Sequence, residues 1–280
     1  MAKRTRERQD VALPGHVRLR LTVAYDGTAY VGWQLQPEGV SVQLRVEEAL
    51  GRIFTPTPRV CSSSRTDTGV HALGMVVHFD VPAAQWRMTA RKLVLAVNAW
   101  LPEDVRVMAA ARVRPGFHAR FDATRKQYRY LVWNHAAQNP LLRTRAWHVP
   151  KPLDVAAMRR AAAEIVGQRD FRAFSATPGY HRENTVRNLT RCQVLRTGSL
   201  LTFVIEADGF LYKMCRGIVG TLVQVGSGRF APEDVPRMLS GCDRRLAGMT
   251  APACGLTLHR VWYGGRRSGP AEPGDELNVE

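Results

Sequence analysis

The sequence predicts an α+β fold in which a mixed central β-sheet is flanked by helices. Some segments, such as residues 17–25, alternate apolar and polar residues with the period of two expected of a half-buried strand. Others, such as residues 42–53, place apolar residues at helical spacing. The two kinds of segment are interspersed without a strict strand–helix–strand order, and the hydrophobic fraction of 45% is sufficient for a real core.

The first half of the chain is predicted to contain four strands and two helices. Ser41 is a candidate N-cap for the first helix, because its hydroxyl can accept a hydrogen bond from a free N–H group of the first turn. The strands are expected at residues 17–25, 75–81, 105–113 and 128–133, and the helices at 42–53 and 89–99.

The second half repeats this mixture. Asp154 opens a predicted helix over 154–166, and Pro232 opens a short one that ends at Gly241. Between them lies an apolar helix from Leu211 to Val225. Strands are expected near residues 187–196, 200–207 and 256–263.

A length of 280 residues fits one large domain or two modest ones. The best candidate boundary between two halves lies between Pro140 and Pro152. The expected organisation is a disordered basic arm, an N-terminal catalytic half, a C-terminal half and a disordered tail, at residues 1–16, 17–145, 146–263 and 264–280.

The formal charge of +16 indicates a polyanionic partner, most often a nucleic acid. Of the 40 basic residues 35 are Arg, whose planar guanidinium suits phosphate and stacks on bases. Genomic base composition is the competing explanation for the excess of Arg over Lys. The net charge stands under either explanation.

Cysteine usage and hydropathy predict a cytoplasmic protein. The five cysteines are scattered and odd in number, which argues against a disulfide framework and fits a reducing compartment. No apolar run approaches the roughly 18 residues that a membrane span requires, and the basic N-terminus has no apolar stretch behind it. Metal-ligand spacings and glycine-rich phosphate loops are missing, so neither a metal nor a nucleotide cofactor is expected.

Residues 65–72, R-T-D-T-G-V-H-A, form the leading candidate site. Asp67 lies two residues from Arg65 on a glycine-containing turn, and a neighbouring opposite charge favours the ionised carboxylate. An ionised Asp is a poor general acid at neutral pH but a usable nucleophile or electrostatic partner. Asp and Gly are also common in idle surface turns, and the octapeptide alone supports both interpretations equally.

Two further segments offer aromatic faces. In residues 25–34, Y-D-G-T-A-Y-V-G-W-Q, Tyr30 and Trp33 could stack on a base, or could cover a core edge behind a hairpin loop. In R-K-Q-Y-R-Y at 125–130, cations and rings alternate, which is typical of surfaces for unstacked bases and phosphates. Tyr128 and Tyr130 would share one strand face and Arg129 the other, and an amphipathic edge strand is the alternative.

The segment 208–216, D-G-F-L-Y-K-M-C-R, leads into the apolar helix. Lys213 and Arg216 cannot both be solvated if that helix is central, and a buried cation requires an anionic partner. Asp67 is the expected partner. Snorkelling of the cations from the helix end is the alternative.

Taken together, these motifs resemble the bacterial tRNA pseudouridine synthase A family. The resemblance rests on Y-D-G-T-x-Y-x-G-W-Q, S-R-T-D-x-G-V-H-A, K-x-Y-x-Y, F-L-x-x-M-x-R-x-I-V-G and A-P-x-x-G-L. They occur in this order and span residues 18 to 263, nearly the whole predicted core.

The resemblance implies an enzyme that isomerises uridine to pseudouridine at tRNA positions 38, 39 and 40, in the anticodon arm. It implies two ferredoxin-like halves with an active-site cleft between them, a homodimer, and no cofactor or metal. The family's nucleophilic Asp corresponds to Asp67, its accompanying Arg to Arg65, its second active-site Arg to Arg216, and its base-stacking Tyr to Tyr128. Tyr30, Trp33 and Arg129 are the further expected substrate-binding residues.

A flipped uridine must leave its stem and stack on a ring, which costs a few kcal/mol. Asp67 could then attack C6 of the base, or abstract a proton and stabilise a sugar cation at C1′. The sequence does not choose between the two routes. A non-catalytic RNA-binding protein or RNA chaperone is the alternative function, and Asp67 argues against it because a purely electrostatic binder gains nothing from a carboxylate.

Overall fold

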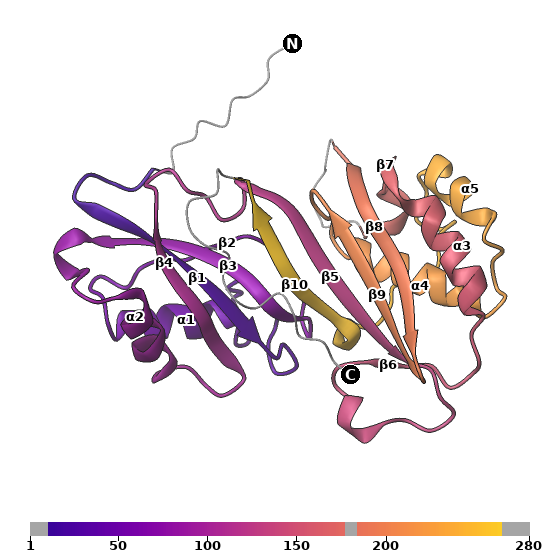
Figure 1. The fold of residues 1–280 in the computed structure, drawn as a ribbon, viewed down its shortest axis with the longest axis horizontal. Coiled ribbons are helices and arrows are strands. Elements are labelled where there is room, and N and C mark those ends of the chain that lie inside the picture. Colours follow the sequence, from indigo (N-terminus) through magenta and orange to yellow (C-terminus); the bar gives the residue numbers. More distant parts are fainter. Residues whose placement is uncertain (1–10, 177–183, 265–280) are drawn as a thin grey trace, which may run out of the picture.

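Ten strands form one mixed sheet that runs through the whole molecule. The computed structural model describes residues 11–176 and 184–264 (Figure 1). The strands are β1 (His16–Tyr25), β2 (Cys61–Ser62), β3 (His71–Pro82), β4 (Val105–Val113), β5 (Ala123–Trp133), β6 (Trp147–His148), β7 (Gly167–Asp170), β8 (Val186–Thr197), β9 (Leu200–Ala207) and β10 (Leu256–Tyr263). The main path through the sheet is β4-β1-β3-β10-β5-β9-β8-β7, with β2 on β3 and β6 on β5. The predicted α+β class with a mixed sheet is therefore confirmed.

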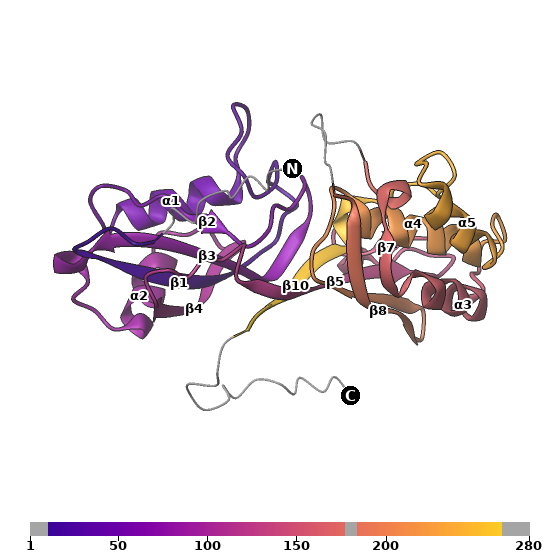
Figure 2. The same ribbon diagram turned by 90° about the horizontal axis from the view of Figure 1, so that it is seen from above.

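The helices gather in two groups at opposite ends of this sheet (Figure 1). They are α1 (Val42–Gly51), α2 (Ala90–Asn98), α3 (Val155–Ile165), α4 (Met214–Gly226) and α5 (Asp234–Gly241), with short 3₁₀ turns at Ala83–Gln85, Pro140–Leu142, Arg172–Phe174 and Ala253–Gly255. α1 and α2 lie at one end, and α3, α4 and α5 at the other. Seen from above, β10 and β5 bridge the two groups (Figure 2).

The last strand holds the two ends of the sheet together. β10 pairs in parallel with β3, through Thr257 and Leu258, and antiparallel with β5 along most of its length. The segment of highest sequence number thus lies between strands from much earlier in the chain. Pairing between such distant strands depends on which strand edges are free to form hydrogen bonds in the assembled sheet. It therefore cannot be predicted from a local sequence pattern.

Capping residues explain where helices begin. Ser41 accepts a hydrogen bond from the N–H of Leu44 at 3.2 Å, and Asp154 from that of Ala157 at 2.9 Å, as the sequence predicted. The apolar helix starts at Met214, three residues later than expected, because Lys213 adopts a left-handed backbone with φ of 58°. Leu211 to Lys213 therefore form a turn at the helix entrance.

α4 is the central helix of its group. Every residue except Arg216 and Gln224 is buried. A Cβ atom on Gly220 would lie 1.8 Å from the Met249 carbonyl oxygen, so this close approach of two backbones requires glycine. The tight packing fixes the N-terminal turn of α4, which carries Arg216.

Some strands are longer than predicted, because pairing with distant strands holds residues of low strand propensity in an extended conformation. β3 begins at His71, and β5 at Ala123. Among the described residues, no helix is long and apolar enough to cross a bilayer. The predicted tail lies outside the described residues apart from residue 264, and the predicted arm apart from residues 11–16.

Candidate active site

Asp67 lies on the loop between β2 and β3. Gly69 takes a left-handed backbone with φ of 76°, and the Val70 N–H donates to the Asp67 carbonyl oxygen at 3.1 Å. This turn reverses the chain just before β3 and leaves the Asp67 side chain 21% exposed. The carboxylate is therefore held by a defined turn and still reachable from outside.

The segment after β1 supports the Asp67 loop from behind. The Trp33 N–H donates to the Thr66 carbonyl oxygen at 3.1 Å, and the Thr68 hydroxyl donates to the Val31 carbonyl oxygen at 3.0 Å. A Cβ on Gly32 would lie 2.6 Å from the same Thr66 oxygen, and Gly32 has a φ of 105°. Glycine is needed there because the two loops touch backbone to backbone.

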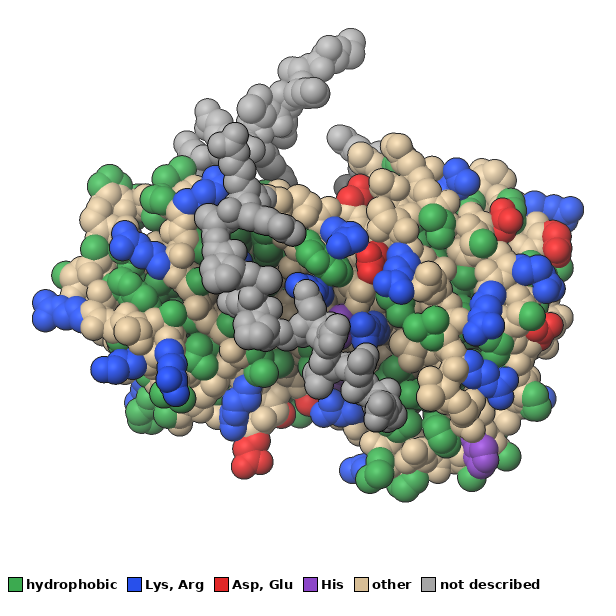
Figure 3. Space-filling view, in the orientation of Figure 1, with side chains coloured by type: hydrophobic (Ala, Val, Ile, Leu, Met, Phe, Trp, Pro, Cys, Tyr) green, Lys and Arg blue, Asp and Glu red, His purple; other side chains and the backbone are tan. Residues whose placement is uncertain are grey.

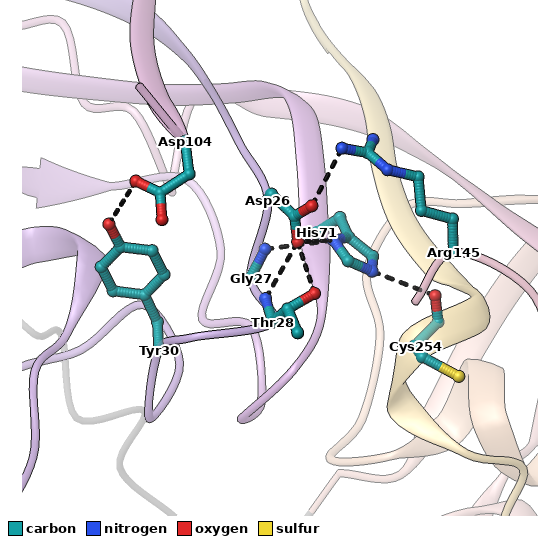
Figure 4. A network of polar contacts seen from close by, with 8 residues as sticks. All are labelled: Asp26, Gly27, Thr28, Tyr30, His71, Asp104, Arg145 and Cys254. Atoms are coloured by element: carbon teal, nitrogen blue, oxygen red, sulfur yellow. Dashed lines mark hydrogen bonds and ion pairs between the residues drawn. The ribbon is translucent and has the colours of Figure 1, made fainter. Parts of the chain in front are cut away.

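A polar network anchors this support to β10 (Figure 4). Asp26 accepts hydrogen bonds from the backbone and hydroxyl of Thr28, and Arg145 pairs with its second oxygen at 2.9 Å. Burial raises the pKa of Asp26, but Thr28, His71 and Arg145 together hold it below its ordinary value. His71 receives the Gly27 N–H and lies 3.0 Å from the Cys254 carbonyl oxygen. His71 therefore ties the end of the Asp67 loop to the segment that enters β10.

Arg216 is the ion-pair partner of Asp67. Its Nη1 atom lies 3.0 Å from Asp67 Oδ2, and its Nε donates to the Ala251 carbonyl oxygen at 2.7 Å. The Arg216 side chain is 14% exposed, so the pair is largely shielded from water. The expectation that Asp67 neutralises a cation of the apolar helix is confirmed.

The Asp67–Arg216 pair lies in the wall of a cavity of about 1550 Å³. The lining comes from the loop before β3, from β5 and from the entrance of α4. Seven lining residues carry positive charge and Asp67 alone is acidic; the cations are Arg59, Arg65, Arg120, Lys126, Arg187, Lys213 and Arg216. The cavity therefore suits an anionic ligand.

Positive charge also spreads over the molecular surface. The described atoms in Figure 3 show Lys and Arg side chains over both ends of the molecule and few acidic ones. Such a distribution raises the local concentration of a polyanion around the protein.

Tyr128 faces the cavity from β5. The residue is 7% exposed, and its ring meets that of Phe210 edge to face, with centroids 4.9 Å apart. Burial raises the pKa of Tyr128 far above that of free tyrosine, so the side chain stays a neutral phenol. Lys126, two residues earlier, lines the same cavity, and burial with the nearby Arg120 lowers the pKa of Lys126 to about 8.

Two other predicted site residues, Arg65 and Trp33, line the cavity but do not have the contacts or exposure expected of them. Arg65 lines the cavity but is exposed, and the ion pair with Asp67 is made by Arg216. Trp33 contributes to the lining, yet its side chain is only 1% exposed and lies 5.9 Å from the Tyr25 ring. It is packed into the core, which is the alternative that the sequence left open beside base stacking.

Tyr30 and Arg129 are not part of the cavity lining. Tyr30 is 5% exposed and donates from its hydroxyl to Asp104 at 2.6 Å (Figure 4). Arg129 projects from the other face of β5 and donates to Gln127 at 3.1 Å. Strand alternation, with Tyr128 as reference, would have selected Lys126 in place of Arg129.

A cluster of one thiol and two imidazoles is a feature that the sequence spacing missed. Cys61, His78 and His118 place ligand-type atoms within 4.8 Å of one another, although neither spacing in the sequence suggests a site. Cys61 and His78 are cross-strand partners on β2 and β3, and His118 follows β4. Only the tertiary structure brings them together.

Comparison with known proteins gives one family. A model of the tRNA pseudouridine synthase family matches residues 161–264. The chain is 44% identical over 249 residues to the tRNA pseudouridine synthase A of Moorella thermoacetica, covering 88% of this chain and 99% of that protein. It is 42% identical to the one from Pelobacter propionicus and 43% to the one from Geobacter sulfurreducens, with the same coverage. With these identities over nearly the full length of its relatives, the chain belongs to the tRNA pseudouridine synthase A family.

Proposed function

We propose that the protein is an isomerase that converts uridine to pseudouridine in tRNA, at positions 38, 39 and 40 of the anticodon stem-loop. The observation that carries the proposal is a shielded carboxylate in a cationic cavity. Asp67 is held by Arg216 at 3.0 Å in a cavity that has seven basic lining residues. A pure binding surface for RNA would have no use for that carboxylate.

The reaction breaks the N-glycosidic bond, turns the uracil and joins C5 to C1′. Asp67 serves it by adding to C6 of the base or by stabilising a cation at C1′. Both routes need the carboxylate ionised, and Arg216 supplies the opposite charge beside it at 3.0 Å. Arg216 also holds the carboxylate in place through its second hydrogen bond to Ala251, so little reorganisation is needed during the reaction.

The remaining cavity residues would bind the substrate. Tyr128 provides the ring on which the flipped uracil stacks, backed by Phe210. Arg65 and the other lining cations contact phosphates. Tyr30 and Trp33 would help substrate binding only indirectly, because their segment holds the Asp67 loop in place. Arg129 would contact RNA only on the opposite face of the sheet.

We further propose that residues 17–145 and 146–263 form two ferredoxin-like halves, with the active-site cleft between them, and that two copies of the chain form a cytoplasmic homodimer. The separation of the helices into two groups at the ends of the sheet supports the first point (Figure 1). Dimerisation rests on the resemblance, and sedimentation velocity of the pure protein tests it directly.

The experiment that tests the proposed function is pseudouridine mapping. Unmodified tRNA bearing uridines at positions 38, 39 and 40 is incubated with the pure protein, derivatised by pseudouridine-specific chemistry, then digested and analysed by mass spectrometry. New pseudouridine at these positions supports the proposal. Tight tRNA binding without any isomerisation would leave the RNA-binding or chaperone alternative.

The affinity for tRNA should fall steeply with salt. Each phosphate that an Arg or Lys neutralises releases counterions, and seven cations line the cavity. If about six phosphates are neutralised, the association constant should drop by roughly 10³-fold between about 50 and 200 mM salt. Filter binding over a salt series measures the slope, and a flat response would exclude an electrostatic mode of binding.

Tyr128 should contribute through its ring. Tyr128→Phe should retain most of the tRNA affinity, whereas Tyr128→Ala should lose roughly 1–3 kcal/mol of stacking energy. Because the residue is 7% exposed, thermal unfolding must show that the Ala variant is folded at the assay temperature. Equal losses of turnover in the two variants would assign the role to the hydroxyl instead, in proton transfer at C5.

A further inference from the structure

The cluster of Cys61, His78 and His118 has the ligand types of a metal site, but its hydrogen bonds oppose one. His118 Nδ1 accepts the backbone N–H groups of Arg120 and Phe121, at 3.0 and 3.1 Å. His78 Nδ1 accepts the N–H of Ala119 at 3.2 Å. A nitrogen that accepts hydrogen bonds carries no proton, so in both neutral rings the proton sits on Nε2.

This tautomer decides what the cluster can bind. A histidine normally ligates a metal through a bare nitrogen and donates from the other one. His118 has the reverse arrangement: its Nε2, which lies 3.6 Å from Cys61 Sγ, carries the hydrogen. Metal binding at Nε2 would require an imidazolate or the loss of two backbone hydrogen bonds. The ring instead donates its N–H to the sulfur, an arrangement that suits a negatively charged sulfur and not a metal ion.

Cys61 is one of two cysteines that line the cavity, and unlike the other, Cys215, it is only partly buried. It shares the lining with the cations Arg120 and Lys126. Burial raises the pKa of Cys192 to about 12 and that of Cys215 well above the ordinary value. Burial also raises the pKa of Cys242 and of Cys254. Cationic surroundings and a hydrogen-bond donor are what distinguish reactive thiols from inert ones.

We propose that Cys61 is a modification site: a thiol in the cavity wall, activated by His118, that hydroperoxides oxidise and soft electrophiles alkylate. With hydrogen peroxide, the thiolate sulfur attacks one oxygen and the O–O bond breaks. The leaving hydroxide takes up a proton as water. Sulfur loses two electrons to become a sulfenic acid, and peroxide gains them. A small thiol then attacks the sulfenic sulfur, the S–O bond breaks and the oxygen leaves as water, which gives a mixed disulfide. A second small thiol attacks the small-molecule sulfur of this mixed disulfide, which releases the Cys61 thiolate and the oxidised small-molecule disulfide.

The consequence for function rests on the proposed tRNA-binding role of the cavity. Cys61 shares the lining with the basic residues that would hold phosphates. An added oxygen or a bulkier adduct at the sulfur would occupy space beside them and disturb the donor arrangement of His118. Oxidation of Cys61 would therefore lower tRNA modification reversibly.

The test begins with reactivity in the absence of RNA. The pure protein is treated with a limiting amount of iodoacetamide, and mass spectrometry of its peptides follows all five cysteines. Cys61 should react at least 10-fold faster than Cys242, which is also partly exposed and serves as the internal reference. The variant His118→Asn keeps an acceptor for the two backbone N–H groups but removes the donor to sulfur. It should slow Cys61 labelling at least threefold, whereas the control His135→Asn should not.

Equal labelling of Cys61 and Cys242, or no effect of His118→Asn in a folded protein, would overturn the proposal. A zinc titration separates the metal alternative: stoichiometric Zn²⁺ binding that blocks labelling would make the cluster a metal site. In a second arm, peroxide should reduce activity in the parent, with recovery after thiol treatment. The activity of Cys61→Ser after the same peroxide treatment should equal the activity of this variant without treatment. Labelling needs no tRNA, so its outcome is independent of whether the proposed isomerase activity is correct.

Discussion

Asp67→Asn should give a folded protein that binds tRNA with near-normal affinity and forms essentially no pseudouridine. The amide keeps the size of the carboxylate and can still accept the hydrogen bond that Arg216 donates at 3.0 Å. It loses the charge and the nucleophilicity, on which both proposed routes depend. Affinity for tRNA should stay the same or rise, because a negative charge beside the phosphates has been removed.

Single-turnover conversion of uridine measures this effect. The matched control is Asp243→Asn, since Asp243 pairs with Arg245 on the surface and is not one of the residues that line the cavity. If folded Asp67→Asn converted uridine within tenfold of the parent rate, about 1.4 kcal/mol of barrier, Asp67 would not be the nucleophile. The control should show the parent rate.

Arg216→Met should produce the second-largest loss, about 10²-fold in turnover. Met fills a similar volume, but it leaves Asp67 without its ion-pair partner in a site where the carboxylate is 21% exposed. A misplacement of about 1 Å in a catalytic group is enough for a loss of this size. The melting temperature should also fall, because an unpaired shielded charge remains.

Arg216→Lys should restore only part of this activity. Lysine carries the charge, but its single ammonium cannot reproduce the fork that contacts Asp67 and the Ala251 carbonyl oxygen at the same time. The surface substitution Arg237→Met, at a side chain that is 84% exposed, is the control for loss of one positive charge. Full activity of Arg216→Met would show that the ion pair is structural and has no part in positioning Asp67.

The central ion pair follows from the sequence through the energetics of charge burial. A cation on an apolar helix needs a carboxylate, and Asp67 is the candidate with the right surroundings; the contact with Arg216 confirms it. Proximity along the chain is less informative. Arg65 is two residues from Asp67, but the described contacts include no ion pair between their side chains, and Asp67 pairs with Arg216 of α4 instead.

The positions of the aromatic residues likewise depend on contacts between segments that are distant in the chain. Tyr30 and Trp33 look like stacking platforms in a glycine-rich loop, yet both are at most 5% exposed. Whether a ring in a loop faces solvent or core depends on what the loop packs against. Here the partner is the Asp67 loop, which is more than 30 residues away in the chain.

The sequence by itself determined the fold class, most strands and helices, the capping residues, the family and the identity of the charged pair. These follow from local periodicity, from short-range hydrogen bonds and from the cost of burying an unpaired charge. Only the tertiary structure decided the insertion of β10 between β3 and β5, the burial of Tyr30 and Trp33 behind the Asp67 loop, and the meeting of Cys61 with His118. These features depend on contacts between distant segments, whose geometry is set when the whole sheet forms and is encoded in no single stretch of the chain.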